Sequence, residues 1–196
     1  MGSINLKHTG SGSAIALSSD GTSLLLNGTA IGGGGGGADL YDANESSPTA
    51  QPSATGANAI AIGDSAVASG TKSLSTGVGT AAGWGSVALG HNTSTAGSYA
   101  VAIGANASGN GSIGHGHGSV ALGGGNAAGA ISVAIGDSRA GGTNSLSVVI
   151  NDATTSYGAS GADSIAIGKL AKAAPSPSMA IGTGAISTTA NQIALG

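Results

Sequence analysis

The sequence predicts an all-β fold, a parallel β-roll in which coils of about 14 residues stack along one axis. Three observations support this prediction: a five-residue pattern occurs ten times, it alternates large with small side chains, and glycine closes nearly every copy. Self-similarity at a fixed period is typical of a stacked array. The chain is therefore expected to fold as a solenoid, and not around a single globular core.

The repeated pattern is clearest at Ser86–Gly90, which reads Ser-Val-Ala-Leu-Gly. The first apolar residues of its copies stand at positions 60, 74, 87, 101, 120, 133, 146, 165, 179 and 193. The steps from each copy to the next are therefore 14, 13, 14, 19, 13, 13, 19, 14 and 14. Two coils are thus expanded by five residues over the common period.

Each copy predicts a short strand with two unlike faces, because side chains alternate with period 2. We expect the branched and long apolar side chains to fill the roll, and the Ser and Ala side chains to let other copies of the chain approach closely. The predicted core residues are Ile60, Ile62, Val87, Leu89, Val101, Ile103, Val120, Leu122, Val133, Ile135, Ile165, Ile167, Ile181 and Ile193. The predicted contacts between chains are Ser86, Ala88, Ala102, Ala121, Ala134, Ala166 and Ala180.

A second strand is predicted in the other half of each coil. The Gly that ends each first strand suits a tight turn with positive φ. A small residue follows eight positions after the first apolar one, as at Ala68, Thr95 and Ala173. A coil with so few large side chains buries little apolar surface against the entropy of ordering its backbone, which predicts association of several chains.

The composition excludes several classes of protein. Of 196 residues, 39 are Gly, aromatic residues make up 2% and Phe is absent, so a core of large side chains is not available. The absence of Cys excludes disulfides and thiolate metal sites. A net charge of −3 provides no basic field for nucleic acid. Because no apolar run is long enough to span a bilayer, we expect no membrane contact by these residues.

The chain is expected to have two parts. Residues 1–58 are irregular, with two short strands near 14–17 and 24–26, the first of which is a candidate worn copy of the repeat. Residues 32–37 are six glycines and belong to a predicted loop. Residues 59–196 carry the roll.

The repeat unit resembles the head repeats of the YadA-like trimeric autotransporter adhesins. The resemblance is carried by Ser132–Gly136, by Ala59–Gly63 with Ala66, Ala68 and Gly70, and by the other copies. It implies a left-handed roll, a homotrimer around one axis, and display on the bacterial cell surface by an outer-membrane anchor, in proteins associated with virulence. The function it implies is non-catalytic attachment to host cells or to matrix proteins of the collagen, fibronectin or laminin class.

The chain also departs from that family. It shows no neck motif, heptad stretch or anchor, so an isolated head is expected. The copies at Ser73–Gly77 and Ser145–Val149 are worn, and two coils are longer than the family pattern.

Four residues are candidate ligand-binding residues. His115 and His117 lie in the first long coil and could share a metal ion, but no carboxylate is near them, and a polar surface loop is the favoured interpretation. Asp152 and Tyr157 lie in the second long coil, where a protruding loop could contact a partner. No metal or cofactor is predicted.

Two other classes of function are less well supported. An enzyme needs clustered acids or bases in a pocket, and within the array only Asp152 and Asp163 are loosely close in sequence. An ice-binding solenoid needs a flat outward ladder of Thr, which the repeats do not provide. Exposed aromatic side chains at Trp84 and Tyr99 could anchor a partner or could cover a neighbouring coil.

Overall fold

The computed structural model describes residues 4–6, 15–19, 24–26, 29–30, 50–105, 109–148 and 156–196. The chain forms two compact units, Met1–Asn44 and Glu45–Gly196. In the first unit, four strands form an antiparallel sheet in the order β1 (Ile4–Leu6), β2 (Ile15–Ser19), β3 (Leu24–Leu26) and β4 (Thr29–Ala30). β2 and β3 lie where the sequence analysis expects two short strands. Because β2 pairs only within this sheet, its residues are not a worn copy of the array.

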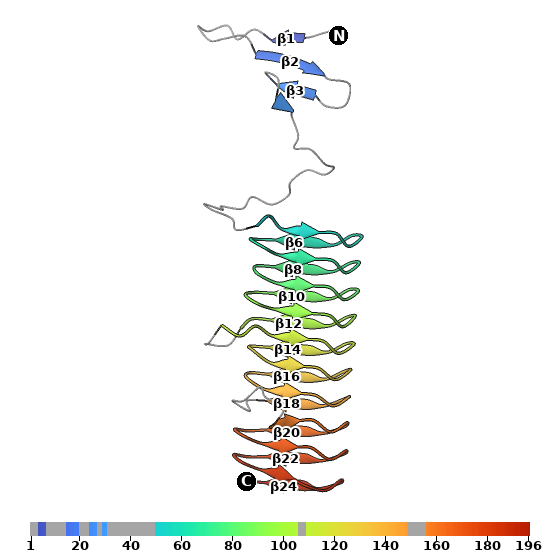
Figure 1. Cartoon of the computed structure of the whole chain (residues 1–196), viewed down its shortest axis with the longest axis vertical. Coiled ribbons are helices and arrows are strands. Elements are labelled where there is room, and N and C mark those ends of the chain that lie inside the picture. The colour runs from blue at the N-terminus through green and yellow to red at the C-terminus, as the bar shows by residue number, and fades with distance from the viewer. Residues whose placement is uncertain are drawn as a thin grey trace. The chain divides into compact units, whose positions relative to one another are not determined.

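The second unit is a stack of coils with two parallel ten-stranded sheets, as Figure 1 shows. The first sheet contains β6 (Ile60–Ile62), β8 (Leu74–Thr76), β10 (Val87–Leu89), β12 (Val101–Ile103), β14 (Val120–Leu122), β16 (Val133–Ile135), β18 (Leu146–Val148), β20 (Ile165–Ile167), β22 (Met179–Ile181) and β24 (Ile193–Leu195). The second sheet contains β5 (Ser53–Ala54), β7 (Val67–Ala68), β9 (Thr80–Ala81), β11 (Ser94–Thr95), β13 (Ile113–Gly114), β15 (Asn126–Ala127), β17 (Arg139–Ala140), β19 (Gly158–Ala159), β21 (Lys172–Ala173) and β23 (Ile186–Ser187). These stacked coils confirm the predicted all-β parallel roll and its period. The part of the chain described here contains no helix that could span a bilayer.

The strands of the first sheet pair in register, so each repeat position forms a ladder through the stack. Val87 pairs with Val101, Ala88 with Ala102, and the same correspondence continues to β24. β5 already pairs with β7, so the stack begins before residue 59.

The two faces of the first sheet are the reverse of the prediction. The small side chains predicted to contact other chains are fully buried inside the roll, because Ser86, Ala88, Ala102, Ala121, Ala134, Ala166 and Ala180 are all 0% exposed. The side chains predicted to form the core lie on the outer surface and are half-buried or exposed. This correction applies to Ile60, Ile62, Val87, Leu89, Val101, Ile103, Val120, Leu122, Val133, Ile135, Ile165, Ile167, Ile181 and Ile193.

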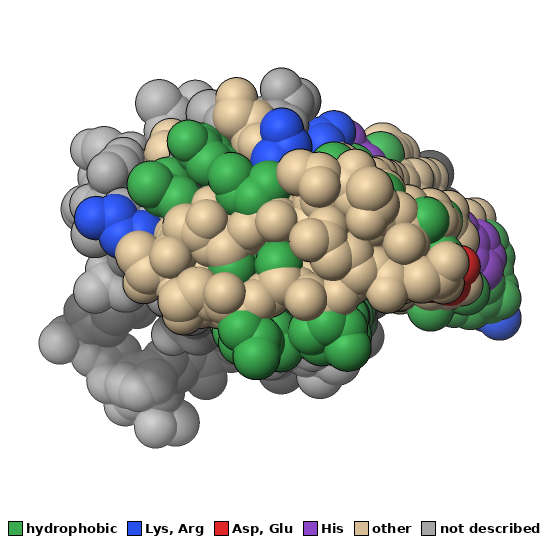
Figure 2. Space-filling view, turned by 90° about the horizontal axis from the view of Figure 1, so that it is seen from below, with side chains coloured by type: hydrophobic (Ala, Val, Ile, Leu, Met, Phe, Trp, Pro, Cys, Tyr) green, Lys and Arg blue, Asp and Glu red, His purple; other side chains and the backbone are tan. Residues whose placement is uncertain are grey.

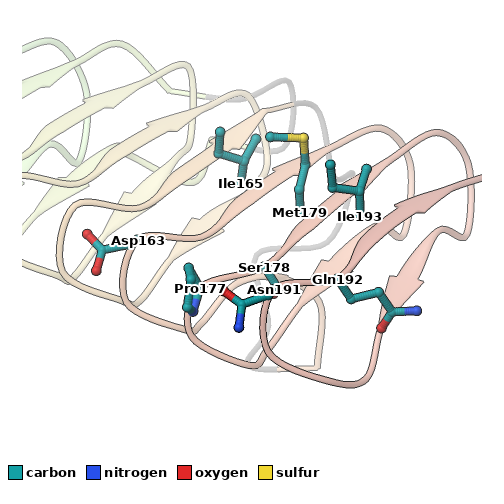
Figure 3. A pocket seen from close by; sticks show the side chains of 8 residues that line it. All are labelled: Asp163, Ile165, Pro177, Ser178, Met179, Asn191, Gln192 and Ile193. Carbon is teal, nitrogen blue, oxygen red and sulfur yellow. The ribbon is translucent and has the colours of Figure 1, made fainter.

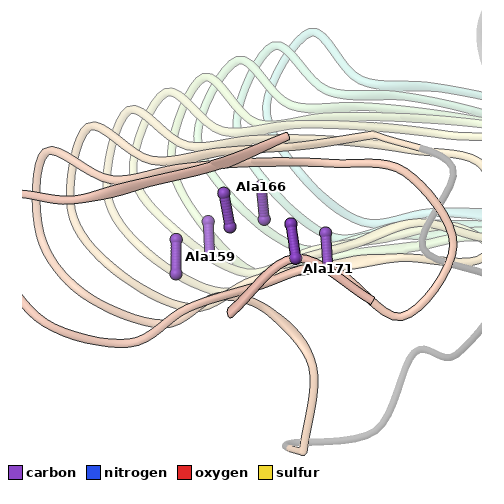
Figure 4. Close-up of a cluster of buried hydrophobic side chains, with 6 residues drawn as sticks. Ala159, Ala166 and Ala171 are labelled. Carbon is purple, nitrogen blue, oxygen red and sulfur yellow. The ribbon is translucent and has the colours of Figure 1, made fainter. Parts of the chain in front are cut away.

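The reason for the reversal is the short distance between the two sheets. A Cβ atom added to Gly125, just before β15, would clash with the carbonyl oxygen of Ala134 in β16. Only Ala, Ser, Thr and Gly fit between sheets that approach this closely, so the core consists of methyl and hydroxyl groups. In Figure 4, alanines of the two sheets point toward one another, with Ala166 on one side and Ala159 and Ala171 on the other.

The two edges of the roll differ in length. Every connection from the second sheet to the next strand of the first sheet has five residues, as in 69–73 between β7 and β8. We call the row of these connections the constant edge. Connections in the opposite direction vary from three residues at 77–79 to nine at 104–112, and we call them the variable edge.

The variable edge explains a second error of the prediction. Three coils have 13 residues, and the residue they lack is in the variable connection from the first strand to the second. In these coils the inward small residue of the second strand therefore stands seven positions after the first apolar residue, and not the predicted eight. Ala81, Ala127 and Ala140 are accordingly buried in β9, β15 and β17.

The constant connections share one local structure. In most coils the second residue is Gly, the fourth has positive φ, and the fifth is Ser or Ala pointing inward. At Gly129, an added Cβ would clash with the carbonyl oxygen of Gly142 in the next coil. The backbone N–H of the fourth residue donates to the carbonyl of the third residue one coil earlier, as from Tyr99 to Trp84 at 2.8 Å. The constant edge is therefore hydrogen-bonded from coil to coil.

Candidate functional site

The two predicted histidines lie in a part of the coil that the sequence did not indicate. His115 and His117 are both exposed, and both belong to the constant connection 115–119 between β13 and β14. The five additional residues of this coil are instead in the connection 104–112 on the variable edge. The His pair therefore lies in a surface connection of ordinary length and outside the expanded part of its coil. Among the described residues, no three His, Asp or Glu side chains gather to hold a metal ion.

The second pair of candidates gives a mixed result. Asp152 lies outside the described residues. Tyr157 is half-buried and packs against the alanine cluster around Ala159 and Ala171, so its ring contributes to the core of its coil. A role for Tyr157 in binding stays a prediction.

Side chains on the constant edge form a row of contacts that the sequence analysis did not detect. The ring centroids of Trp84 and Tyr99 lie 4.8 Å apart, and those of Tyr99 and His117 lie 5.4 Å apart, both edge to face. The Lys72 Nζ lies 5.2 Å from the centroid of the Trp84 ring. The signal that could have revealed this row was the constant length of these connections, which aligns side chains of successive coils that are distant in sequence.

The outward face of the first sheet is a continuous apolar surface, which we call the aliphatic face. It has two ladders, formed by the first and third residues of each strand from β6 to β24, and Thr76 is the one polar side chain in them. Ile103 is 40% exposed and Ile135 is 36% exposed, although both lie in the middle of the stack, away from its ends. Contiguous apolar surfaces of this kind mark interaction sites in soluble proteins. Figure 2 shows hydrophobic side chains grouped on the outside of the molecule.

A shallow hollow lies where the aliphatic face meets the constant edge. Its volume is about 180 Å³. Ile165, Met179 and Ile193 form one side, and Asp163, Pro177 and Asn191 approach from the turns, as Figure 3 shows. The hollow is open and its walls are mostly aliphatic, so it suits contact with a protein surface better than enclosure of a small molecule.

A second hollow lies on the variable edge and is polar. It measures about 340 Å³, and its lining includes Asn92, Asn110, Asn126 and Asp137. The Asn126 Oδ1 atom is buried without a hydrogen-bond partner. These amide groups offer both donors and acceptors, but the described lining contains no paired base or nucleophile for catalysis.

The described carboxylates are separated along the stack. Asp64 and Asp137 lie on the variable edge five coils apart, and Asp163 lies on the constant edge. The Asp163 carboxylate accepts a hydrogen bond of 3.1 Å from Asn144 Nδ2. Since general acid–base catalysis by two carboxylates needs both at one reacting bond, this arrangement does not form such a site.

Comparison with known proteins identifies the repeat in part of the stack. Residues 54–80, 81–107 and 159–185 match the YadA head domain repeat, whose family model contains two copies of the repeat. No curated protein matches the chain. Each matched segment spans successive coils of the stack, with the Ser or Ala positions inside and the aliphatic positions outside. The matched coils of the solenoid are therefore YadA-like head repeats.

Proposed function

We propose that this chain is the head of a bacterial surface adhesin that attaches to host cells or to extracellular matrix proteins. The observation that supports it best is the match of the stacked coils to the YadA head repeat. A rod of stacked coils can act by presenting the same surface many times, because several weak contacts on one scaffold give a high overall affinity. Collagen, fibronectin and laminin are the matrix proteins to test first.

We further propose that three copies of the chain assemble with their aliphatic faces around a common axis. Each face runs through ten strands, and a parallel stack advances about 4.8 Å per strand, so the apolar surface is about 43 Å long. Covering it removes Val, Ile and Leu side chains from water, each worth about 1.5–3 kcal/mol when fully buried. The number three comes from the likeness to the YadA family. An outer-membrane anchor and a role in virulence belong to the same proposal.

The assembly is tested by placing charge on the aliphatic face. The double variant Ile103→Glu and Ile135→Glu should shift the protein from trimer to monomer in sedimentation equilibrium. The matched control is Ile186→Glu, because Ile186 is 48% exposed on the second sheet, away from the aliphatic face. A wild-type protein that sediments as a folded monomer would overturn the trimer.

Adhesion is tested on the assembled protein. Wild-type protein should bind immobilised matrix proteins or cultured host cells, and the monomeric double variant should lose most of that binding because the copies no longer act together. The absence of binding to all three matrix proteins and to cells would contradict the adhesin function. An ice-binding role has little support, since the outward column of the second sheet contains Val67, Thr80, Ser94, Ile113 and Asn126 in successive coils and no ladder of Thr.

A further inference from the structure

The long connection 104–112 on the variable edge contains the dipeptide Asn110-Gly111. The other Asn-Gly pair of the chain, Asn27-Gly28, lies outside the described residues. Asparagine is one of the chemically labile residues of proteins. A glycine after it leaves the side-chain amide carbon open to the next backbone nitrogen, because Gly has no Cβ atom. The pair at 110 and 111 is therefore a candidate site of covalent change.

The packing of the coils requires Gly at position 111. A Cβ atom added to Gly111 would clash with the carbonyl oxygen of Asn92, which lies in the preceding coil. The backbone just after Gly111 is also fixed, because the Ser112 N–H donates to the Gly104 carbonyl at 3.0 Å. No larger residue fits after Asn110, so no side chain hinders a reaction between these two neighbours.

The nitrogen that such a reaction needs is accessible in the folded protein. The Gly111 N–H donates no hydrogen bond to another described residue. The Asn110 side chain is exposed, and both residues line the open polar hollow of the variable edge. Water can therefore reach the pair, and the Gly111 nitrogen can act without first breaking a bond to the described part of the chain.

We propose that Asn110 deamidates spontaneously in the folded protein, through a cyclic imide formed with Gly111. The Gly111 nitrogen attacks Cγ of Asn110, so that the N–Cγ bond forms and the Cγ–Nδ2 bond breaks. Ammonia leaves with the proton of the Gly111 nitrogen. Water then opens the ring: cleavage of the N–Cγ bond gives aspartate, and cleavage between the nitrogen and the backbone carbonyl carbon gives isoaspartate. The reaction consumes water, releases ammonia and needs no oxidant or cofactor.

Either product changes the variable edge. Both place a new carboxylate in the hollow, in which Asp137 already provides one. Isoaspartate also lengthens the backbone by a methylene group next to Gly111, where the chain is already in contact with the Asn92 carbonyl. Because the released ammonia is lost to solvent, the hollow becomes more acidic as the protein ages.

Two other asparagines provide internal controls. Asn144 is exposed, but it precedes Ser145, and its Nδ2 donates to the Asp163 carboxylate at 3.1 Å. Asn191 is exposed and precedes Gln192. In both cases the following side chain hinders the approach of the backbone nitrogen. We expect both to convert at least about tenfold more slowly than Asn110, which corresponds to a barrier about 1.4 kcal/mol higher.

A second modification is conceivable at the same residues and fits the fold less well. Asn110-Gly111-Ser112 is also an acceptor pattern for an N-linked sugar. Ser112 is fully buried, and its Oγ donates to the Ile103 carbonyl at 2.9 Å and accepts from the Gly124 N–H at 3.0 Å. A transferase that recognises the hydroxyl of this pattern cannot reach it in the folded coil. The structure therefore favours deamidation.

The experiment uses the intact protein, kept for days at neutral pH with and without guanidinium chloride, followed by peptide mapping with mass spectrometry. The peptide that contains Asn110 should gain the mass of an amide replaced by a carboxyl group, and should separate into aspartate and isoaspartate forms. An isoaspartate methyltransferase should label the second form. The rate should be similar in the folded and the unfolded protein, because the Gly111 nitrogen is accessible in both.

Two variants complete the test. Asn110→Gln keeps the amide but would need a larger ring, so position 110 should stay unmodified. Asn110→Asp should elute from an ion-exchange column with the aspartate form of the aged wild-type protein. Peptide mapping separates both from any change at Asn27.

Four results would overturn the inference. The first is no conversion at Asn110, and the second is conversion of Asn144 or Asn191 at the same rate. The third is an acceleration by denaturant of more than about tenfold, which would show that the fold protects Asn110. The fourth is a sugar on Asn110 in protein from its native cells. None of these results bears on adhesion, so the proposed function stands or fails separately.

Discussion

Ser132 Oγ donates a hydrogen bond of 2.6 Å to the carbonyl oxygen of Gly129, three residues earlier in the same constant connection. Ser86, Ser145 and Ser164 make the equivalent bond in their own coils. Ser119 occupies the same position, yet its Oγ is buried without a partner. The same repeat position is therefore hydrogen-bonded in these four coils and buried without a hydrogen bond in the coil of Ser119.

The Ser132→Ala variant should lower the free energy of unfolding by about 1 kcal/mol, because it removes a buried hydrogen bond. The Ser119→Ala variant should be neutral or stabilising, because it removes a buried hydroxyl that has no partner. Urea unfolding of the two variants measures both effects. An equal decrease in the free energy of unfolding for both variants would show that the hydrogen bond of Ser132 does not stabilise the protein.

The reversed faces of the first sheet make a second prediction. Ala134→Leu should destabilise the protein by about 1–3 kcal/mol or more, because the added atoms enter a core in which the sheets are already in contact. Val133→Leu, at the adjacent outward position, should cost less than about 1 kcal/mol. Thermal unfolding distinguishes them. A larger loss of stability for Val133→Leu than for Ala134→Leu would indicate that the aliphatic side chains, and not the alanines, face the inside of the roll.

Ile131 offers a stabilising substitution. This β-branched residue has a φ of 54° and is 62% exposed, at a position where five of the nine other coils have Asn or Gly. Ile131→Asn should raise the free energy of unfolding by about 1–2 kcal/mol, since Asn tolerates left-handed backbone. The matched control is Ile186→Asn in β23, which relieves no left-handed strain and should not stabilise. Stabilisation of both variants would point to lower surface hydrophobicity as the cause.

The long connection of the variable edge should be replaceable. Residues 104–112 can be exchanged for the sequence of 136–138, Gly-Asp-Ser, which joins β16 to β17 in only three residues. The register of the later coils should be unchanged, because it is held by the constant edge, and stability should change by about 1 kcal/mol or less. Circular dichroism and thermal unfolding check this. Loss of β structure would show that the nine-residue connection is needed to form its coil.

The sequence was sufficient to predict the class of fold, the number of coils and the register of the first sheet. These follow from Gly and aliphatic residues that recur at fixed spacing, and each is a local property of the repeat. It was not sufficient to predict which face is inside. Alternation at Val87, Ala88 and Leu89 separates two faces, but only the distance between the sheets decides that the methyl group of Ala88 is the one that fits.

The candidate site was less predictable for a related reason. Sequence spacing alone did not reveal whether the additional residues of a long coil lie before or after the second strand. His115 and His117 could therefore be placed in the first long coil, but not on one of its two edges. The contact between Trp84 and Tyr99 depends on the same information, because two residues in different coils become neighbours only when the constant connections are aligned.

Because the coils stack in register, the length of the solenoid can change by the gain or loss of whole repeats. Every coil adds one residue to each ladder and joins the next coil through a five-residue constant connection, so duplication of one repeat inserts a unit that fits its neighbours. Each such event would lengthen the rod by about 4.8 Å. A lineage could thus change the length of the rod in small steps, without redesigning any existing contact.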